Sequence, residues 1–384
     1  MTFWKAAKSK SCRKAGRTER PLTKGEVNML RKALLTASVV ALMSVPGIAQ
    51  AQNKTITLIQ PNNGTMGFYG LHSARLLGYF EEEGVNVKLL SGDTSVPYAA
   101  FLTNGDVDLA MLDGSETFQA RNANIGAVTV YTLHNRAPEG VFVSKDSPIK
   151  SVTELKGKTI GLASDRDLAV VKVAMAHAGS NADGVNTVVV GDSGPTLANV
   201  FLKGTAAAFA GSGNDVAALK ARGIELRDIM PESAKNSPAN TYSMLANRMD
   251  ELREPLCGFF RAYSKGVHVG LVDMEAVAAL SRKGVPHEWE SSAFGYGYLN
   301  TVKGLQIPPN PEMIGEVNVA AWEGVQKDMV LIGSVEKESS LDDILSNDFM
   351  GCANDFDRAE VASEVKAWMA DPANAEFVKK PATQ

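Results

Sequence analysis

The side chains best suited to ligand chemistry are polar and aromatic residues in short loops that follow predicted β-strands. Amide side chains donate and accept hydrogen bonds, and aromatic rings can stack on a flat molecule. Because the carboxyl ends of neighbouring strands in an α/β sheet meet at one edge, we expect these loops to line a single ligand site. The predicted ligand-binding residues are Asn62, Asn63, Phe68, Tyr69, Asp93, Thr94, Asp113, Ser115, Glu116, Ser164, Asp165, Arg166, Ser212, Asn214 and Tyr242.

Several of these residues also have a purely structural interpretation. Phe68 and Tyr69 would equally begin the apolar face of a core helix, although the polar tip of Tyr favours a site slightly. Asp113 or Ser115 would suit the N-cap of the helix that follows, and the polar loop at residues 92–95 is also typical of a cap. If one of these carboxylates faces the ligand instead, the preferred ligand group is an amine or amidine.

Arg166 offers the opposite chemistry. It lies at the predicted start of a helix, where backbone N–H groups suit an anion, and its guanidinium adds a fork of donors. Asp165 and Asp167 flank it; they would repel an anion and are themselves favourable first-turn residues. The sequence therefore favours a planar nitrogen heterocycle over a sulfonate or carboxylate, and it leaves both open.

Other site chemistry has little support in the sequence. The five histidines are far apart and show no metal-ligand spacing. The pair Gly211-x-Gly213 lacks the third glycine of a dinucleotide fingerprint, and no Gly-Lys-Ser/Thr phosphate loop occurs. With no recognisable base–nucleophile pair, we expect no cofactor, no metal and no catalysis. Cys257 and Cys352 could pair in an oxidising compartment, but the sequence does not place them within bridging distance.

Alternating predicted strands and helices must position these loops. The first unit contains strands at 55–59, 85–90, 107–112 and 128–133, with helices at 68–83, 96–104 and 115–123. The second contains strands at 141–143, 159–163, 187–190, 206–210 and 242–246, with helices at 168–177, 197–203 and 215–222. Beyond about residue 250 the chain is helical and acidic. This order predicts an α/β fold with mostly parallel sheets flanked by helices.

Charge separates a basic leader from an acidic body. Residues 1–51 carry 10 Lys/Arg and 2 Asp/Glu, a net charge of +8, whereas the other 333 residues carry a net charge of −12. An acidic body argues against binding to nucleic acid or to an anionic membrane surface. The 45% hydrophobic content excludes a disordered or fibrous chain, and 3 cysteines exclude a disulfide scaffold.

The leader has the pattern of a secretory signal. Arg31 and Lys32 precede an apolar stretch at residues 33–43 that is too short to span a bilayer. Small residues at positions −3 and −1 then predict cleavage after Ala51 and a periplasmic location. Because this signal is complete from Met29, we interpret residues 1–28 as lying before the true start of translation. The mature chain is expected to be soluble, without insertion in the membrane.

Several short motifs, in order along the chain, resemble one family of transport proteins. They include Leu-Gly-Tyr-Phe-Glu-Glu-Glu-Gly-Val at 77–85, Asn-Gly-Asp-Val-Asp-Leu-Ala at 104–110 and Asp-Ser-Pro-Ile at 146–149. Leu-Lys-Gly-Lys-Thr-Ile-Gly follows at 155–161, and the later motifs are Trp322, Gly333, Leu-Asp-Asp at 341–343 and Asn-Asp-Phe-Asp at 354–357. Together they resemble the periplasmic solute-binding proteins of ABC importers that serve thiamine-precursor pyrimidines, nitrate, alkane sulfonates and taurine. The resemblance covers about residues 54–365.

The resemblance implies a two-lobed periplasmic binding protein fold with a ligand cleft between the lobes. It implies a first lobe from residues 52–142 and 245–384, and a second from residues 143–244, with crossings near Gly140 and Tyr242. Such proteins close on the solute by a hinge motion and then dock on the membrane permease of the transporter. We expect a monomer that binds a small organic solute.

Three roles remain open on this fold. The first is a binding subunit for a pyrimidine-like nitrogen heterocycle, or alternatively for an alkane sulfonate, taurine or another small anion. The second is an enzyme similar to the pyrimidine synthases of thiamine biosynthesis, which carry a cysteine-rich motif that this chain lacks. The third is a sensor subunit that reports the solute to a membrane kinase.

Overall fold

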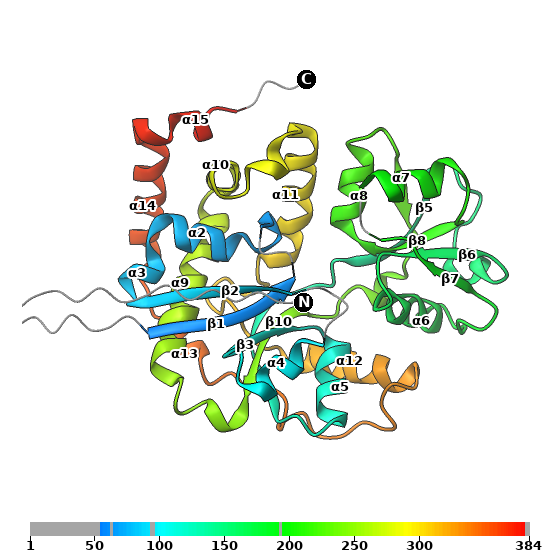
Figure 1. Cartoon of the computed structure of the whole chain (residues 1–384), viewed down its shortest axis with the longest axis horizontal. Helices are drawn as coiled ribbons and strands as arrows, with labels where there is room; N and C mark the ends of the chain where they lie inside the picture. The colour runs from blue at the N-terminus through cyan, green and yellow to red at the C-terminus, as the bar shows by residue number, and fades with distance from the viewer. Residues whose placement is uncertain (1–53, 62–63, 93–96, 192–193, 381–384) are drawn as a thin grey trace, which may run out of the picture. The chain divides into compact units, whose positions relative to one another are not determined.

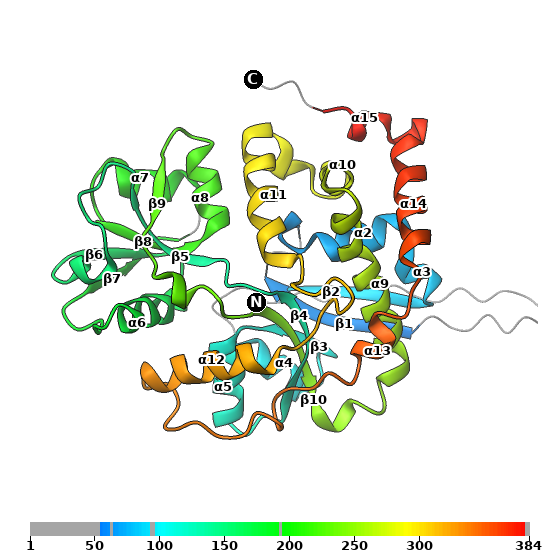
Figure 2. The same cartoon turned by 180° about the vertical axis from the view of Figure 1, so that it is seen from behind.

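The computed structural model describes residues 54–61, 64–92, 97–191 and 194–380, and it contains two five-stranded sheets (Figures 1 and 2). The predicted export signal at 1–51 and the predicted site residues Asn62, Asn63, Asp93 and Thr94 lie outside the described residues.

The first sheet has the strand order β2-β1-β3-β10-β4. Its strands are β1 (Lys54–Pro61), β2 (Val85–Gly92), β3 (Leu109–Leu112), β4 (Ala127–His134) and β10 (Ala239–Leu245). Strand β1 pairs in parallel with β2 and β3, whereas β10 runs antiparallel between β3 and β4. The sheet is therefore parallel except for the one strand that returns from later in the chain.

The second sheet has the strand order β7-β6-β8-β5-β9. Its strands are β5 (Glu139–Ser144), β6 (Thr159–Leu162), β7 (Asn186–Val189), β8 (Ala208–Ser212) and β9 (Leu226–Asp228). The β6 strand pairs in parallel with β7 and β8, and β5 runs antiparallel to β8 and β9. The chain passes between the sheets twice, in residues 135–138 and again in residues 229–238, ahead of Gly140 and Tyr242 respectively.

Helices cover both faces of each sheet. The helices of the first unit are η1 (Met66–Phe68), α2 (Tyr69–Leu77), α3 (Tyr79–Glu82), α4 (Tyr98–Asn104) and α5 (Gly114–Asn122). Those of the second are η2 (Val152–Leu155), α6 (Asp167–His177), α7 (Gly194–Leu202), α8 (Gly213–Lys220) and η3 (Glu232–Ala234). The rest are η4 (Ala246–Arg248), α9 (Arg253–Val272), α10 (Met274–Gly284), η5 (Pro286–Trp289), α11 (Ser292–Gln306), α12 (Val319–Leu331), α13 (Met350–Ala353), α14 (Arg358–Ala370), η6 (Pro372–Asn374) and α15 (Ala375–Val378). This alternation confirms the predicted α/β class.

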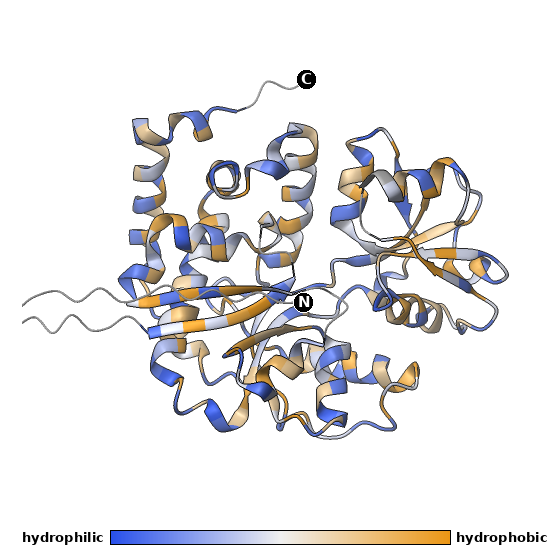
Figure 3. Cartoon of the chain, viewed as in Figure 1, coloured by the Kyte–Doolittle hydropathy of each residue, from blue (hydrophilic) through white to orange (hydrophobic). Residues whose placement is uncertain are grey.

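Alternate residues of the strands enter different hydrophobic clusters. On β3, Leu109 and Met111 pack in the cluster that contains α9, whereas Ala110 and Leu112 pack with α4. The second sheet is divided in the same way, with Val141 on the side of α6 and Phe142 on the side of α7 and α8. This pattern follows from the two-residue period of a strand. Helix α14 carries both hydrophilic and hydrophobic residues along its length (Figure 3) and packs against the helices α9, α2 and α10.

One predicted helix is interrupted. The pattern at residues 68–83 predicts a continuous helix, but Gly78 takes a left-handed conformation with φ of 86° and separates α2 from α3. A residue without a Cβ adopts this conformation at little cost, so Gly78 ends α2.

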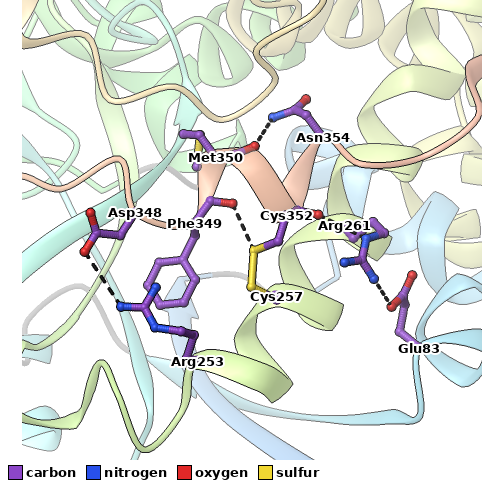
Figure 4. Close-up of a disulfide and its surroundings, with 9 residues drawn as sticks. All are labelled: Glu83, Arg253, Cys257, Arg261, Asp348, Phe349, Met350, Cys352 and Asn354. Atoms are coloured by element: carbon purple, nitrogen blue, oxygen red, sulfur yellow. Dashed lines mark hydrogen bonds and ion pairs between the residues drawn. A yellow bond between two sulfur atoms is a disulfide. The ribbon is translucent and has the colours of Figure 1, made fainter.

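A disulfide joins Cys257 on α9 to Cys352 on α13, with the Cα atoms 5.4 Å apart (Figure 4). The sequence left this pairing open because the two residues are separated by 95 positions. Arg261, one turn along α9, supports the junction: its Nε donates to the Cys352 carbonyl at 3.0 Å and its Nη1 donates to Glu83 at 2.6 Å. The bridge therefore holds the helix α13, from late in the chain, against the long helix α9.

Candidate functional site

A cavity of about 960 Å³ lies at the carboxyl ends of β1, β3, β6 and β8. The loops after these strands form much of its wall, and the passages near residues 137–139 and 237–240 form another part. Helices α11 and α12 contribute further side chains. Ligands of open α/β sheets bind at this edge, so the cavity is the candidate ligand site.

Nine of the predicted site residues line this cavity. Sequence positions as far apart as 68 and 214 come together because each follows the end of a strand. The nine are Phe68, Asp113, Ser115, Glu116, Ser164, Asp165, Arg166, Ser212 and Asn214.

Tyr69 and Tyr242 do not line the cavity. Both are fully buried in the hydrophobic core of the first sheet. The Tyr69 hydroxyl donates to the Val267 carbonyl on α9 at 3.1 Å, since the first turn of α2 faces that helix. The Tyr242 hydroxyl donates to Oε1 of Gln60 at 2.8 Å, from the middle of β10. For these two tyrosines the structural interpretation is the correct one.

Asp113 and Glu116 cap helix α5 and also reach across the cavity. Asp113 Oδ1 accepts from the Glu116 backbone N–H at 2.7 Å, and Glu116 Oε2 accepts from the Asp113 N–H at 3.0 Å. This reciprocal arrangement is a capping box. The box uses Oδ1 of Asp113 and Oε2 of Glu116, so Oδ2 of Asp113 stays outside it.

Arg166 uses both of these carboxylates. Its Nη2 lies 3.1 Å from Asp113 Oδ2 and 2.6 Å from Glu116 Oε2. Arg166 follows strand β6 of the second sheet, whereas Asp113 and Glu116 follow β3 of the first, so the ion pair connects segments of both sheets. Burial, followed by repulsion from Asp113, raises the pKa of Glu116 to about 7, although Arg166 acts in the opposite direction.

Acidic residues outnumber basic residues in the wall of the cavity. Besides Arg166, the exposed Lys172 is the second Lys or Arg in the described wall. Seven carboxylate residues face these two cations: Asp113, Glu116, Glu139, Asp165, Asp167, Asp215 and Asp328. An anionic solute would therefore enter an unfavourable field.

Glu139 is a candidate binding residue that sequence reasoning missed. It is the first residue of β5, directly after one passage between the sheets, and its carboxylate has no side-chain partner among the described residues. Burial, then the carboxylates of Asp167 and Asp113, raise the pKa of Glu139 to about 8. The sequence feature that could have indicated Glu139 as a site residue is its position, as a charged residue next to Pro138 at the start of an otherwise apolar strand.

Two other carboxylates of the wall have local roles. Asp167 Oδ2 accepts from the N–H and hydroxyl of Ser164, at 2.7 and 2.9 Å, at the start of α6. Asp328 on α12 lies 2.6 Å from Nε2 of His177 on α6. Burial raises the pKa of Asp167. These interactions fix the α6 side of the cavity.

The aromatic part of the wall is Phe68 with its neighbours. Its ring stacks on His134, with ring centroids 5.5 Å apart and planes 17° from parallel. His134 Nε2 lies 3.0 Å from the Gly67 carbonyl and its Nδ1 lies 2.9 Å from the Asn240 amide nitrogen. Burial lowers the pKa of His134 to about 4. A neutral ring that donates from Nε2 and accepts at Nδ1 satisfies both contacts, so His134 acts as a rigid support for Phe68.

Hydrogen bonds to α11 and η5 fix the short helix η1, which carries Phe68. Thr65 Oγ1 lies 2.9 Å from the Tyr298 hydroxyl, and Glu288 accepts from the Met66 N–H at 2.7 Å. Tyr298 and the buried Tyr98 also line the cavity. The aromatic wall is thus built from three elements and is not confined to the loop after β1.

Residues 54–61, 64–92, 97–191 and 194–380 contain neither a metal-binding group nor a membrane-spanning helix. In these ranges no group of three or more His, Cys, Asp or Glu residues is arranged to hold a metal ion. None of the helices in the same ranges combines the length and the apolar character needed to cross a bilayer.

Two curated proteins are similar in sequence. The riboflavin-binding protein RibY of Chloroflexus aurantiacus is 26% identical over 245 residues, which cover 62% of this chain and 68% of that protein. The 4-amino-5-hydroxymethyl-2-methylpyrimidine phosphate synthase of Aspergillus parasiticus is 26% identical over 191 residues, which cover 50% of this chain and 52% of the synthase.

Solved structures identify the fold. The periplasmic aliphatic sulphonate binding protein SsuA of Escherichia coli superposes with a TM-score of 0.60 at 16% sequence identity, over 76% of this chain and 91% of that one. The two sheets therefore form the periplasmic binding protein fold, as the sequence motifs predicted. The model of the NMT1/THI5-like family matches residues 65–273, more than half of the chain. With this match and with the cavity at the strand ends, the protein belongs to the NMT1/THI5-like family.

Proposed function

We propose that this protein is the extracytoplasmic solute-binding subunit of an ABC importer and that it captures a pyrimidine-like nitrogen heterocycle between two closing lobes. The family, the fold and the cavity at the strand ends support a binding role for a small molecule. The sheets with their helices would be the lobes, and residues 135–138 and 229–238 would act as the hinge.

The observation that carries the choice of solute is the environment of Arg166. This residue was the predicted anchor for a sulfonate or carboxylate. Its Nη2 is instead engaged by Asp113 and Glu116, in a wall with seven carboxylates and two cations. A ring with amino or protonated ring-nitrogen groups fits this wall better than a sulfonate does, and Phe68 supplies a surface for stacking.

The sulfonate alternative rests on the sulphonate-binding structure of the same fold. Identity of 16% supports the fold and not the ligand. The enzyme alternative rests on the synthase relative, which spans half of this chain. Glu116 and Glu139 in the described wall have raised pKa values and would suit proton transfer. His134 in the same wall is buried, and both of its ring nitrogens already have hydrogen-bond partners, so it does not favour the enzyme.

Thermal unfolding with a panel of solutes tests the proposal. The panel contains aminopyrimidines, flavins, taurine, alkane sulfonates, nitrate and aromatic acids. A solute at 100 times its dissociation constant adds about 2.7 kcal/mol to the free energy of unfolding, which is easily seen as a shift in Tm. We expect a shift with an aminopyrimidine or a flavin that is weaker in Glu139→Gln.

Mass spectrometry of the solute after incubation separates the classes. Recovery of the bound compound unchanged supports a binding protein, and conversion to a product supports an enzyme. A Tm shift with sulfonates alone would contradict the heterocycle assignment. The exposed substitution Glu290→Gln, which lies outside the wall, is the matched control for loss of one negative charge.

A further inference from the structure

The position of Arg166 between two carboxylates suggests which group of a solute binds there. The capping box of α5 fixes the carboxylates of Asp113 and Glu116 in the wall of the cavity. Arg166 places one terminal nitrogen 3.1 Å from Asp113 Oδ2 and 2.6 Å from Glu116 Oε2, and this Glu116 oxygen also accepts from the Asp113 N–H. All three side chains are partly exposed, with exposed fractions of 32% for Arg166, 32% for Asp113 and 16% for Glu116.

The same cavity holds a further acceptor that lacks a donor. The Asn214 amide oxygen is buried without a hydrogen-bond donor in the part of the chain that the structure describes. Buried acceptors without donors cost free energy, so a donor-rich partner in this cavity is favoured. A group that brings positive charge and several N–H bonds meets the requirement of the whole wall.

We infer that Asp113 and Glu116 form the subsite for a cationic group of the solute, an ammonium or amidinium, and that Arg166 competes with this group for the same two carboxylates. The inference rests on the proposed function, because it assigns a chemical class to the solute of that cavity. The contacts of Arg166 show how a solute cation would bind these carboxylates, since a guanidinium and an amidinium both offer planar N–H donors to a carboxylate.

Competition between Arg166 and a cationic solute predicts that loss of Arg166 strengthens binding. Removal of Arg166 would free the carboxylates of Asp113 and Glu116 from an internal partner, and it would make the wall more negative. A cationic ligand would therefore bind more tightly. If Arg166 were an anion anchor, the same substitution would abolish binding. Arg166→Gln therefore separates the two interpretations by the sign of its effect.

Lys172 provides the matched control. It lines the same cavity with the same charge, is exposed, and forms no ion pair with Asp113 or Glu116. Lys172→Gln thus changes the net charge of the wall by the same amount without freeing the subsite. Glu116→Gln removes one charge of the subsite but keeps an oxygen for the Asp113 N–H, since Gln also serves in a capping box.

The probes are three compounds on one ring: benzamidine as the cation, benzamide as the neutral analogue and benzenesulfonate as the anion. Dissociation constants are measured by calorimetry on the full protein and its three variants. We expect benzamidine to bind in preference to the other two compounds and to bind about tenfold more tightly to Arg166→Gln. Lys172→Gln should stay within about threefold of the unsubstituted protein, and Glu116→Gln should weaken benzamidine about tenfold.

Three results would overturn the inference. They are weaker benzamidine binding in Arg166→Gln, equal tightening in Lys172→Gln, or no benzamidine binding by any folded variant. Benzenesulfonate binding that is lost in Arg166→Gln would assign Arg166 as an anion anchor instead. The proposed function fails by a different route, namely when no solute of the thermal panel stabilises a folded protein, so the two failures are distinguishable.

Discussion

The Arg166 guanidinium and the Glu116 carboxylate lie 2.6 Å apart, Nη2 to Oε2, although they follow strands of different sheets. A hydrogen bond joins His177 Nε2 on α6 to Asp328 Oδ1 on α12, also at 2.6 Å. Partly exposed ion pairs contribute about 0.2–1 kcal/mol each. If the two sheets close on a solute as proposed, contacts of this size favour the closed state only slightly, because each contributes little free energy.

The first prediction concerns pH and Glu139. The folded pKa of about 8 lies above the value near 4.3 expected for an unfolded chain. Between these two values the folded state binds more protons than the unfolded state, so this group makes stability fall as pH rises. We expect Glu139→Gln to be more stable than the unsubstituted protein by roughly 1–3 kcal/mol at pH 8 and nearly equal at pH 4.5.

Urea denaturation at pH 4.5, 6.5 and 8 measures this difference. The groups that face Glu139 are the carboxylates of Asp113 and Asp167 and the guanidinium of Arg166, and all three remain in the variant. Glu116 also titrates in this range and is common to both proteins. The exposed control Glu290→Gln should show no such pH-dependent gain, and a uniform gain at all pH values would contradict the prediction.

The second prediction concerns the disulfide. Replacement of both Cys257 and Cys352 by Ser removes a bridge across a separation of 95 residues. We expect the double variant to lose about 2–4 kcal/mol of unfolding free energy, because the unfolded chain is no longer constrained. Reducing agent should destabilise the unsubstituted protein and leave the double variant unchanged. Neither cysteine lines the cavity, so solute affinity should persist at temperatures where the variant is folded.

The third prediction concerns the contact between α2 and α9. A Cβ at Gly266 would lie 2.0 Å from the Gly70 carbonyl oxygen and 3.0 Å from the Ala74 nitrogen, which are both backbone atoms. Gly266→Ala must therefore push two helices apart, and we expect a loss of about 2–4 kcal/mol. Gly324, an exposed glycine within α12, has open space around its Cβ position. Gly324→Ala should stabilise by about 0.5–1 kcal/mol, and denaturation of both variants checks the contrast.

The fourth prediction separates the aromatic residues of the core from those of the site. Tyr242→Phe removes the donor to Gln60 and should cost about 1 kcal/mol of stability without change in solute affinity. Phe68→Leu should weaken binding of a ring-shaped solute several-fold, because it removes the stacking surface. Calorimetry on the folded variants distinguishes them, and a loss of affinity in Tyr242→Phe would place that residue at the site after all.

Much of this architecture follows from local sequence patterns. The alternation of strands and helices predicts the α/β fold, and the loops after strands predict nine residues of the cavity wall. What remained open depends on contacts between distant segments. No local pattern distinguishes Tyr69 on the face toward α9 from Phe68 on the face toward the cavity. Likewise, the pairing of Cys257 with Cys352 depends on packing between segments 95 residues apart. The raised pKa of Glu139 depends on acidic residues that come from both sheets.

The place of β10 in the first sheet sets an order for folding during synthesis. Strand β4 has its sheet neighbour in β10, which is made about 100 residues later, after the whole of the second sheet. The second sheet needs only residues 139–228 and is complete in one continuous stretch. The nascent chain can therefore form the second sheet before β10, the sheet neighbour of β4, has been synthesised. At that stage the unpaired edge of β4 is the segment most open to incorrect pairing.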